Sequence, residues 1–503
     1  MASATAFDDS LRLLGNLRRR LSRGGRPVVL HETHLSWVLL AGRLAVKIKK
    51  PVRLPFVDFS TPQARRQACD AELRLNSRLA PALYRRVVDV GGSLDAPRFG
   101  GCSPPIDALV CMRRFGEGAL MSEALAAGRL APRHLERLAL RVARFHEAAE
   151  VVSDGGDPAR RSIEPVAQVI DQLARFEDGT WIRNALRWLD EEGRRLTPTF
   201  RRRLADGAVR DGHGDLHLAN AVVLGDDATA FDCIEFDPSL RRIDVMADIA
   251  FMTMDLEAHG RPDLAHRFLD ACLEARGDFE GLAVLRFHEV ARACVRRLVQ
   301  RLGPGGVAAG DVDYLVIANR KMSNPPTPRL AITSGPSGSG KSTVAARLVD
   351  VTGAIRVRSD VERKRLAMCV QDDGPLYGTD MTRRTYTRLA TCARLALSAG
   401  YDVIVDAACL RRRQRDEFAR LAAELGVAFT VLAFDAPAAE LARRVRRRLS
   451  EAADPSDADE AVLASQLRDR DPIGAVEEGR TIRIDTGRAV DATAVVATWR
   501  ARA

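Results

Sequence analysis

The sequence predicts an α+β domain followed by an α/β domain built on a parallel sheet. Short strand-like runs gather near the N-terminus and mainly helical sequence follows them, which is typical of α+β domains. Beyond Pro328, strand-like runs alternate with amphipathic helical patterns, which is typical of βαβ units on a parallel sheet. The length of 503 residues agrees with more than one domain, because a single hydrophobic core rarely grows past about 300 residues.

The N-terminal elements can be placed from their hydrophobic patterns. A helix is expected from about Thr61 to Leu79, and mainly helical sequence follows the last strand as far as about Leu302. A turn at Gly42 separates two of the strands, which predicts an antiparallel meander at the start. The expected strands cover residues 27–30, 36–40, 44–48, 84–90 and 109–112.

Glycine and proline clusters mark the end of this first region. The runs 303–306 and 324–328 cannot continue a helix and are typical of domain boundaries. We therefore expect a first domain over 1–302, a linker over 303–328 and a second domain over 329–503. The strands expected in the second domain cover residues 330–334, 355–358, 403–405, 429–434 and 482–484.

Composition narrows the class of protein. The 77 basic and 67 acidic residues give a net charge of +10, but only six of the basic residues are lysine. This arginine bias is typical of genome base composition acting on surface positions, so we do not expect a nucleic-acid partner. The nine cysteines include no C-x-x-C pair, which fits reduced thiols, and no apolar run reaches about 18 residues. We therefore expect a cytoplasmic protein without a membrane span or a membrane partner.

The most specific motif matches G-x-x-x-x-G-K-[ST] between a strand and a helix. Its glycines let backbone N–H groups and the N-terminus of the following helix face phosphate oxygens. Lys341 is expected to neutralise the transferred phosphate and so to act in catalysis, while the Ser342 hydroxyl holds Mg²⁺. A turn that only caps a helix would explain neither the rare lysine nor the preceding strand. The expected nucleotide-binding residues are Gly335, Pro336, Ser337, Gly338, Ser339, Gly340, Lys341, Ser342 and Thr343.

Several charged positions beyond the motif have two interpretations. Asp406 ends an apolar strand and either orders a magnesium water or caps the next helix. Asp360 takes a proton from an acceptor hydroxyl, with Arg363 one helical turn later to fix that substrate, or lies inside a purely structural capping box of Ser359 and Glu362, and both can hold at once. The arginines crowded over 443–448 favour a lid that meets phosphates over a solvated basic face.

The C-terminal part, from Arg329 onward, resembles P-loop kinases of the gluconate kinase, polynucleotide kinase and zeta-toxin type. The resemblance rests on the glycine-rich motif and on the charged positions after it. It implies a P-loop NTPase fold in which lid arginines clamp the nucleotide. The residues to which it assigns a role are Asp360 as the catalytic residue for the acceptor, Arg363 as the substrate-binding residue, and Arg444 and Arg448 as the nucleotide clamp.

A second motif, H-G-D-L-H-L-A-N, lies between strand-like segments of the first domain. The carboxylate of Asp215 can deprotonate an acceptor hydroxyl, while the amide oxygen of Asn220, five positions later, holds a metal. Asp232 ends the next apolar strand and can reach the same metal, although Glu235 and Asp237 are rivals for that role. The alternatives are an inert polar turn or a zinc site on the histidines, which lacks a fourth ligand at a familiar spacing.

Residues 31–302 resemble the aminoglycoside phosphotransferase and choline kinase branch of the two-lobed protein-kinase-like fold. The resemblance rests on this second motif, on the strand that carries K-I-K-K-P and on the run D-C-I-E-F-D. No glycine-rich loop covers the donor phosphates, and residues 31–36 take its place. The roles implied are Asp215 as catalytic base, Asn220 and Asp232 as metal ligands, Lys47 as the donor-phosphate lysine with Lys49 as its alternative, Glu72 as the partner of Lys47, 110–115 as the adenine hinge, and Asp248 as a structural residue.

The order of the two domains is similar to that of bacterial proteins described as aminoglycoside phosphotransferase-like, fused to a P-loop ATP-binding domain. We therefore expect an ATP- and Mg²⁺-dependent phosphotransferase that acts on a hydroxyl of a small molecule. Two alternatives stay open: one half is a nucleotide-binding switch, or the second half is a nucleic-acid end kinase. The acceptors, the donor base and the oligomeric state are open as well. The expected metal-site residues are Asn220, Asp232, Ser342 and Asp406.

Overall fold

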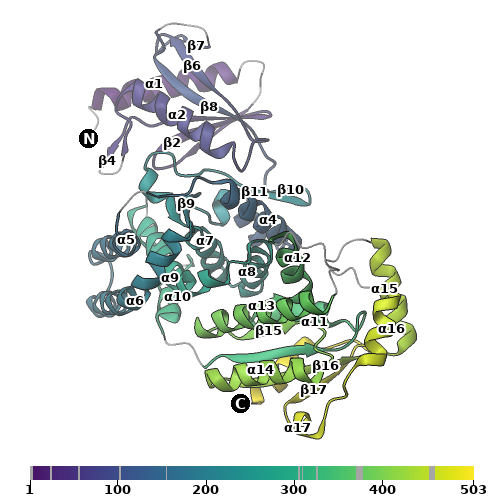
Figure 1. The fold of residues 1–503 in the computed structure, drawn as a ribbon. Coiled ribbons are helices and arrows are strands. Elements are labelled where there is room, and N and C mark those ends of the chain that lie inside the picture. Colours follow the sequence, from purple (N-terminus) through teal and green to yellow (C-terminus); the bar gives the residue numbers. More distant parts are fainter. Residues whose placement is uncertain are drawn as a thin grey trace. The chain divides into compact units, whose positions relative to one another are not determined.

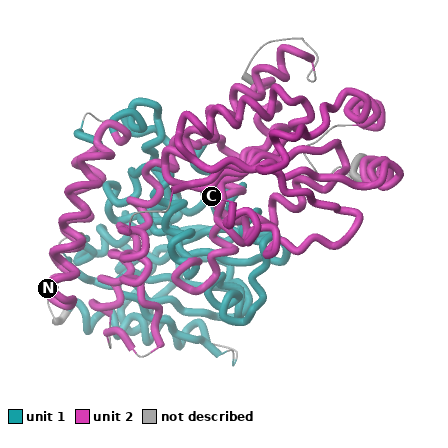
Figure 2. The backbone as a smooth tube through the Cα atoms, turned by 90° about the horizontal axis from the view of Figure 1, so that it is seen from below, with its two compact units in different colours: residues 1–158, 201–255 teal, residues 159–200, 256–503 magenta. Residues whose placement is uncertain are grey.

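The computed structural model divides into two compact units. Unit 1 comprises Met1–Pro158 and Arg201–Asp255, and unit 2 comprises Ala159–Phe200 and Leu256–Ala503 (Figure 2). Each is described by itself. The structure describes residues 4–22, 25, 27–54, 57–100, 104–153, 156–303, 306–308, 310–323, 327–369, 378–451 and 459–502.

Unit 1 contains a six-stranded antiparallel sheet in the order β1-β2-β3-β8-β6-β7 (Figure 1). The five strands expected from the sequence are present, and β7 and the small β4–β5 pair are additions. Short turns join β1 to β2, β2 to β3 and β6 to β7, as antiparallel pairs allow, whereas β8 pairs with β3 and β6 through longer connections. The strands are β1 (Val28–Glu32), β2 (Ser36–Ala41), β3 (Leu44–Lys49), β4 (Arg53–Leu54), β5 (Val57–Asp58), β6 (Tyr84–Gly92), β7 (Pro97–Phe99) and β8 (Asp107–Arg113).

Two helices accompany this sheet. Helix α2 (Pro62–Asn76) begins after Thr61, whose hydroxyl accepts a hydrogen bond from Ala64 N at 3.1 Å. Helix α1 (Ala4–Leu21) was not expected from the sequence. Its buried leucines belong to the same core cluster as Trp37 of β2, so the sheet gains a hydrophobic cover on that face.

The rest of unit 1 is mainly helical and carries the second motif on short elements. The hairpin β10–β11 pairs Ala221 with Ala230, so Asn220 and Phe231 face each other at its open end, and Phe231 N donates to Asn220 O at 2.9 Å. The elements are α3 (Met121–Ala126), α4 (Pro132–Ala148), β9 (Val209–Asp211), η1 (Leu218–Asn220), β10 (Ala221–Leu224), β11 (Asp227–Ala230), η2 (Pro238–Leu240), β12 (Arg242–Asp244) and α7 (Val245–Ala258), which crosses into unit 2.

Unit 2 joins a group of helices to a P-loop-type sheet. Phe200 of α6 packs edge-on against Phe287 of α9, with ring centroids 5.3 Å apart. Helix α10 lies inside the expected linker 303–328. The helices before the sheet are α5 (Pro158–Leu173), α6 (Gly179–Ala205), α8 (Pro262–Arg276), η3 (Phe279–Gly281), α9 (Leu282–Leu302) and α10 (Tyr314–Met322).

The sheet of unit 2 is five-stranded and parallel throughout, in the order β14-β15-β13-β16-β17. Every strand expected from the sequence is present, so the expected fold class, α+β followed by α/β with a parallel sheet, is confirmed. The strands are β13 (Arg329–Ser334), β14 (Ile355–Arg358), β15 (Val403–Asp406), β16 (Ala428–Asp435) and β17 (Thr481–Asp485).

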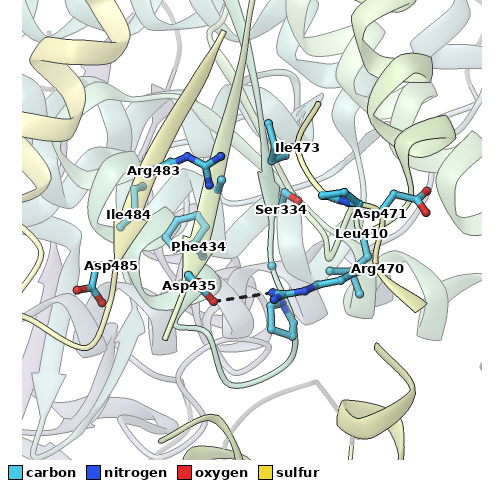
Figure 3. A pocket seen from close by; sticks show the side chains of 14 residues that line it. Ser334, Leu410, Phe434, Asp435, Arg470, Asp471, Ile473, Arg483, Ile484 and Asp485 are labelled. Carbon is cyan, nitrogen blue, oxygen red and sulfur yellow. Dashed lines mark ion pairs between the residues drawn. The ribbon is translucent and has the colours of Figure 1, made fainter. Parts of the chain in front are cut away.

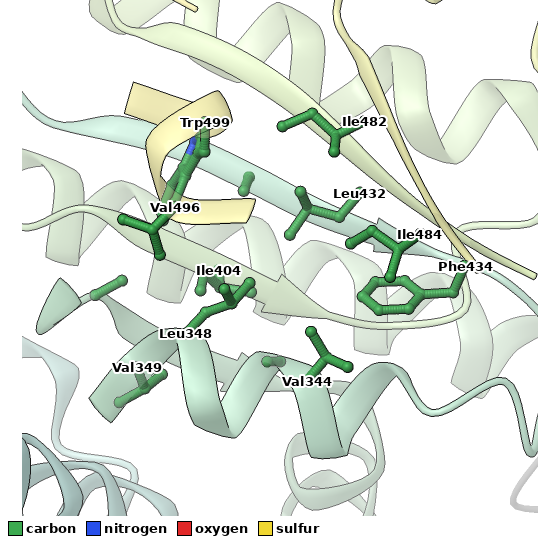
Figure 4. Close-up of a cluster of buried hydrophobic side chains, with 13 residues drawn as sticks. Val344, Leu348, Val349, Ile404, Leu432, Phe434, Ile482, Ile484, Val496 and Trp499 are labelled. Carbon is green, nitrogen blue, oxygen red and sulfur yellow. The ribbon is translucent and has the colours of Figure 1, made fainter. Parts of the chain in front are cut away.

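Helices cover this sheet on both faces. On one face, Leu348 of α11 packs among Ile404, Leu432 and Trp499 of α18 in a buried cluster (Figure 4). The helices are α11 (Lys341–Thr352), α12 (Ser359–Cys369), α13 (Thr379–Ser398), α14 (Arg412–Leu425), α15 (Ala438–Glu451), α16 (Glu460–Asp469), α17 (Ala475–Glu478) and α18 (Ala492–Ala501).

Charged contacts tie α8 to the edge strand β14. Arg356 reaches Asp270 at 2.6 Å, and Arg358 reaches Glu274 at 3.0 Å. Both arginines are largely buried, so these pairs replace lost hydration. Because α8 precedes Pro328, the boundaries of the compact units do not follow the expected domain boundaries, which stay a prediction. Among the described helices, none is both long enough and apolar enough to cross a membrane.

Candidate functional site

The glycine-rich motif lies between the end of β13 at Ser334 and the start of α11 at Lys341. Gly338 and Gly340 have φ angles of +79° and +78°, which favour glycine. A Cβ at Gly338 would lie 2.7 Å from the carbonyl oxygen of Leu441. The loop therefore curls tightly at the N-terminus of α11, as an anion-binding backbone requires.

The expected lysine and the expected metal-site residues lie at this loop. Lys341 Nζ donates to Pro336 O at 2.8 Å, which folds the side chain back over the motif. Ser342 Oγ donates to Asp406 Oδ1 at 3.1 Å. Asp406 does not cap α14, since the N-cap of that helix is Arg411. The two residues expected at the C-terminal metal site are thus in contact.

The residues at this point fit a divalent cation. Asp406 is 4% exposed, and its Oδ2 accepts no hydrogen bond from the described part of the chain. Arg358 Nε lies 3.7 Å from that oxygen, too far for a hydrogen bond. A buried carboxylate oxygen beside a serine hydroxyl is the kind of hard ligand set that Mg²⁺ prefers.

The lid region contacts the motif through one of the two expected arginines. Arg444 of α15 donates to Gly338 O at 3.3 Å and to Thr486 O at 2.8 Å. Ser337 N donates to the side chain of Gln466, on α16, at 2.7 Å. Neither Gln466 nor Thr486 belongs to a motif that could have been recognised from the sequence. The side chain of Arg448 lies outside the described residues.

The acceptor-side residues lie on α12. Asp360 is in its first turn, and Arg363 follows one turn later with 8% exposure. Glu362 does not form the expected capping box, because its carboxylate binds Arg365 and Arg388 instead. The expected role of Glu362 as the second member of a capping box is therefore wrong.

A pocket of about 390 Å³ lies at the carboxyl ends of β13, β16 and β17, next to the first residues of the motif (Figure 3). It is lined by Ser334, Phe434 and Ile484, among others, and Arg470 reaches towards Asp435 at 3.9 Å. Ligands of open parallel sheets bind at this edge of the strands. The edge of the sheet next to the glycine-rich motif therefore contains a pocket.

The expected N-terminal lysines and glutamate meet in a buried ion-pair network. Lys47 and Lys49 point to the same face of β3, and both reach Glu72 of α2, at 2.9 and 2.5 Å. Lys47 also pairs with Asp232, whereas Lys49 pairs with Glu235 at 2.5 Å. The Lys49–Glu235 pair was not expected. It distinguishes the two lysines, because of these two it is Lys47 that contacts Asp232, an expected metal ligand.

The charge balance of this network shifts the pKa values of its members. Burial raises the pKa of Glu72, but attraction by Lys47 and Lys49 outweighs burial and lowers that pKa to about 2. Burial lowers the pKa of Lys47, but Asp232 and Glu72 raise it well above its usual value. Both groups therefore stay charged across the physiological pH range.

The second motif forms a loop held by Asp248, which matches the expected structural role. Asp248 accepts hydrogen bonds from the backbone of His213 and Gly214, both at 2.8 Å, and from His146 at 2.9 Å. Burial raises the pKa of Asp248, but these hydrogen bonds and the nearby histidines lower it to about 2. A charged, fully buried carboxylate thus fixes the backbone next to Asp215.

Asp215 and Asn220 are in direct contact, with Asn220 Nδ2 donating to Asp215 Oδ2 at 2.7 Å. Asp232 lies just past the hairpin and has a φ of +63°, a strained conformation for a non-glycine residue. Glu235 is buried against Lys49, and Asp237 caps η2 through Ser239 N at 2.8 Å. Of the three rivals, Asp232 is the one that combines a partly exposed carboxylate with contact to Lys47.

The expected hinge, residues 110–115, begins on β8 beside this network. Val110 of β8 is the strand partner of Lys47 on β3. Unit 1 therefore brings Lys47, the strand of the expected hinge and the Asp232 carboxylate together from three separate segments of the chain.

Comparison with known proteins gives matches over the second unit and over most of the chain. A family described as an AAA domain matches residues 330–473. The uncharacterized protein Rv2004c of Mycobacterium tuberculosis is 33% identical over 463 residues, which covers 88% of this chain and 90% of that protein. The uncharacterized protein Mb2027c of Mycobacterium bovis matches to the same extent.

Similar solved structures include a choline/ethanolamine kinase family protein from Mesorhizobium loti, with 11% identity, coverage of 62% of this chain and 92% of that chain, and a TM-score of 0.35. A sugar kinase from Janibacter sp. has 22% identity, coverage of 35% of this chain and 96% of that chain, and a TM-score of 0.28. At TM-scores this low, these structures carry no weight for the function of the chain.

Proposed function

The chain belongs to the same family as the mycobacterial protein Rv2004c, and on that premise we propose that it is an ATP- and Mg²⁺-dependent phosphotransferase with two nucleotide-binding sites. Each site would transfer the γ-phosphoryl group to a hydroxyl of a small molecule. The observation that carries the proposal is the contact between Ser342 and Asp406 at the mouth of the glycine-rich loop, because that pair has no structural task in capping α14. The AAA-domain match over the same segment supports it.

In the second unit, the proposed reaction uses the backbone of the glycine-rich loop and four side chains. The backbone of the glycine-rich loop binds the phosphates, and Lys341 moves from Pro336 O to the β and γ oxygens. Arg444 holds the lid against the loop. Asp360 accepts the proton of the acceptor hydroxyl, and Arg363 orients that substrate.

In the first unit, Lys47 binds the donor phosphates while Glu72 holds its ammonium group in place. Asp215 accepts the proton of the acceptor hydroxyl, and Asn220 orients the Asp215 carboxylate. Bound Mg²⁺, held by Ser342 and Asp406 in one site and by Asn220 and Asp232 in the other, would neutralise charge on the phosphate oxygens.

We place this bifunctional enzyme in the cytoplasm. Seven cysteines in the described part of the chain are unpaired, which supports a reducing compartment. Most of the positive charge comes from arginine, a bias that is typical of genome base composition acting on surface positions. We therefore propose a small-molecule acceptor and no nucleic-acid partner.

The test is a labelling experiment. The full chain is incubated with Mg²⁺, ATP labelled at the γ-phosphate and a metabolite extract, and the labelled products of wild type, Asp215→Asn and Lys341→Ala are compared. Asp237→Asn and Arg443→Gln serve as controls, because Asp237 caps η2 and Arg443 binds Glu440 on its own helix. We expect each variant to lose a different product and the controls to lose none.

The alternatives predict other patterns. Loss of the same product in both Asp215→Asn and Lys341→Ala would indicate one catalytic half and one nucleotide-binding switch. Label that appears only on added 5′-hydroxyl oligonucleotides would indicate a nucleic-acid end kinase. No labelled product with any acceptor, from folded protein, would contradict a phosphotransferase.

A further inference from the structure

A cleft of about 840 Å³ lies in unit 2, separate from the pocket at the strand ends. Helices α13, α14 and α16 each contribute one face to its wall, because the lining residues of each helix recur mainly every three or four positions. Ala408, Leu410 and Arg411, after β15, and Arg363 of α12 complete it. The helical lining residues are Thr379, Thr382, Arg383, Tyr386 and Thr387 of α13, Arg413, Gln414, Glu417 and Arg420 of α14, and Val462, Ser465, Gln466 and Asp469 of α16.

Two hydrogen bonds place this cleft beside the glycine-rich loop. Gly335 N donates to Ala408 O at 2.9 Å, and Ser337 N donates to Gln466 Oε1 at 2.7 Å. Ala408 and Gln466 both line the cleft. A molecule in the cleft would therefore lie next to the phosphates that the loop is proposed to bind.

The lining is strongly cationic. Its charged members are two carboxylates, Glu417 and Asp469, and five arginines: Arg363, Arg383, Arg411, Arg413 and Arg420. Within the lining, Arg411 pairs with Asp469 at 3.8 Å. The carboxylate that Arg383 binds, Asp380, is not part of the lining. The described lining thus carries five positive and two negative charges.

An arginine-rich chain has many arginines on its surface. Around the cleft, however, some arginines line the cavity and their immediate neighbours do not. On α14, Arg412 and Arg413 are neighbours and both exposed, yet only Arg413 lines the cleft. On α13, the exposed Arg383 lines the cleft and its partly buried neighbour Arg384 does not. Like charges gathered around one cavity repel each other unless an anion joins them. Guanidinium groups bind phosphates and carboxylates through paired hydrogen bonds, so these are the anions that fit.

We propose that this cleft binds the acceptor alcohol of the P-loop site, and that this acceptor carries an anionic phosphate or carboxylate group held by Arg383, Arg413 and Arg420. The proposal rests on the proposed function of that site. In the transfer, the acceptor oxygen bonds to the γ-phosphorus, the bond from that phosphorus to the β–γ bridging oxygen breaks, ADP leaves with its electron pair, and the hydroxyl proton passes to Asp360. The threonines and Ser465 of the wall supply hydrogen bonds to further hydroxyls of the acceptor.

The experiment uses the full chain with Asp215→Asn, so that labelling reports the P-loop site. A metabolite extract is freed of molecules above a few kilodaltons and divided on an anion-exchange resin. Each fraction is then offered with Mg²⁺ and γ-labelled ATP. We expect labelled product from the retained, anionic fraction. Product from the unretained fraction only, or none from the retained fraction, would overturn the proposal, and product only from the discarded large molecules would favour a nucleic-acid end.

Two further arms sharpen the result. Treating the retained fraction with a phosphatase, which is then removed, abolishes the product if the anionic group is a phosphate and spares it if it is a carboxylate. Calorimetry with Mg²⁺ and a non-hydrolysable ATP analogue separates the two levels of failure. Absence of binding contradicts the proposed function, whereas binding combined with a neutral acceptor contradicts only the anionic cleft.

Matched double variants test the residues. R383Q/R413Q removes two charges from the lining, and R384Q/R412Q removes two charges from the same helices outside it. We expect the first to raise the extract concentration at half-maximal labelling at least about 10-fold, since charge-assisted hydrogen bonds are lost, and the second to leave it unchanged. Equal effects of the two variants would overturn the assignment of the anion to this cleft.

Discussion

The two candidate sites hold charge in opposite ways. Unit 1 balances Lys47 and Lys49 against Glu72 with side chains alone, in a network that is almost wholly buried. Unit 2 relies on backbone: Lys341 contacts the carbonyl oxygen of Pro336, and the loop curls at glycines. The site in unit 1 should therefore be disturbed most by the loss of one buried charge. The site in unit 2 should be disturbed most by a Cβ atom added at a glycine of the loop.

The largest effect is expected from Glu72→Gln. This change leaves two buried ammonium groups with one charged partner fewer, and breaking a buried ion pair costs about 3–5 kcal/mol. Chemical denaturation measures the loss. The control is Asp70→Asn on the same helix, whose carboxylate is 52% exposed and binds Arg66, so we expect less than about 1 kcal/mol. Equal losses would show that the network adds nothing beyond a surface pair.

The same network predicts how stability depends on pH. Glu72 and Asp248 have pKa values of about 2 in the folded chain, below the usual values of 4.5 and 3.8. Their stabilisation is therefore present above about pH 4.5 and is lost as the pH falls towards 2. We expect Glu72→Gln to flatten this decline in a series of denaturation curves. An unchanged slope would mean that Glu72 is not charged in the folded protein.

A smaller effect, confined to unit 2, is expected from Gly338→Ala. Its Cβ would collide with Leu441 O at 2.7 Å, so the loop must open and its phosphate-binding N–H groups move. We expect binding of a Mg²⁺–ATP analogue to weaken at least about 10-fold at this site, as measured by calorimetry. Gly426→Ala is the matched control, since it also has a positive φ, +65°, but open space around it. Weakening by the control would trace the effect to backbone strain in general.

The smallest effect is expected from Arg444→Gln. Arg444 of α15 donates to Gly338 O and Thr486 O and also pairs with Glu440 of its own helix at 2.6 Å, so the change removes one contact between this helix and the loop. We expect the dissociation constant of the nucleotide to rise several-fold. Arg443→Gln, next to it, removes only a contact with Glu440 and should leave the constant unchanged. A rise of the same size in both would indicate a general effect of charge on the helix.

The difference between the sites also explains what could be predicted from the sequence. The glycine-rich loop is contiguous, so its strand, its lysine and its helix were all placed correctly. Asp406, at the end of an apolar strand, was expected either at the metal site with Ser342 or as a helix cap, and the contact with Ser342 places it beside that residue. Gln466 was missed, since a side chain that reaches the loop from more than a hundred residues away leaves no local pattern.

The first unit assembles its site from distant segments, and prediction was weaker there. The pairing of Lys47 with Glu72 was expected through family resemblance, not through spacing. The Lys49–Glu235 pair spans 186 residues and was missed, as was helix α1, whose arginine-rich end hid its buried leucines. Long-range pairing depends on how the chain folds back, which hydrophobic periodicity does not record.

The central claim is that the chain has two independent sites for a magnesium nucleotide. Calorimetric titration of the full chain with Mg²⁺ and a non-hydrolysable ATP analogue tests it most directly. We predict two bound nucleotides per wild-type chain, one in Lys341→Ala and one in Asp232→Asn, and none in the double variant. A single bound nucleotide in the wild-type chain, lost in both single variants, would contradict the claim.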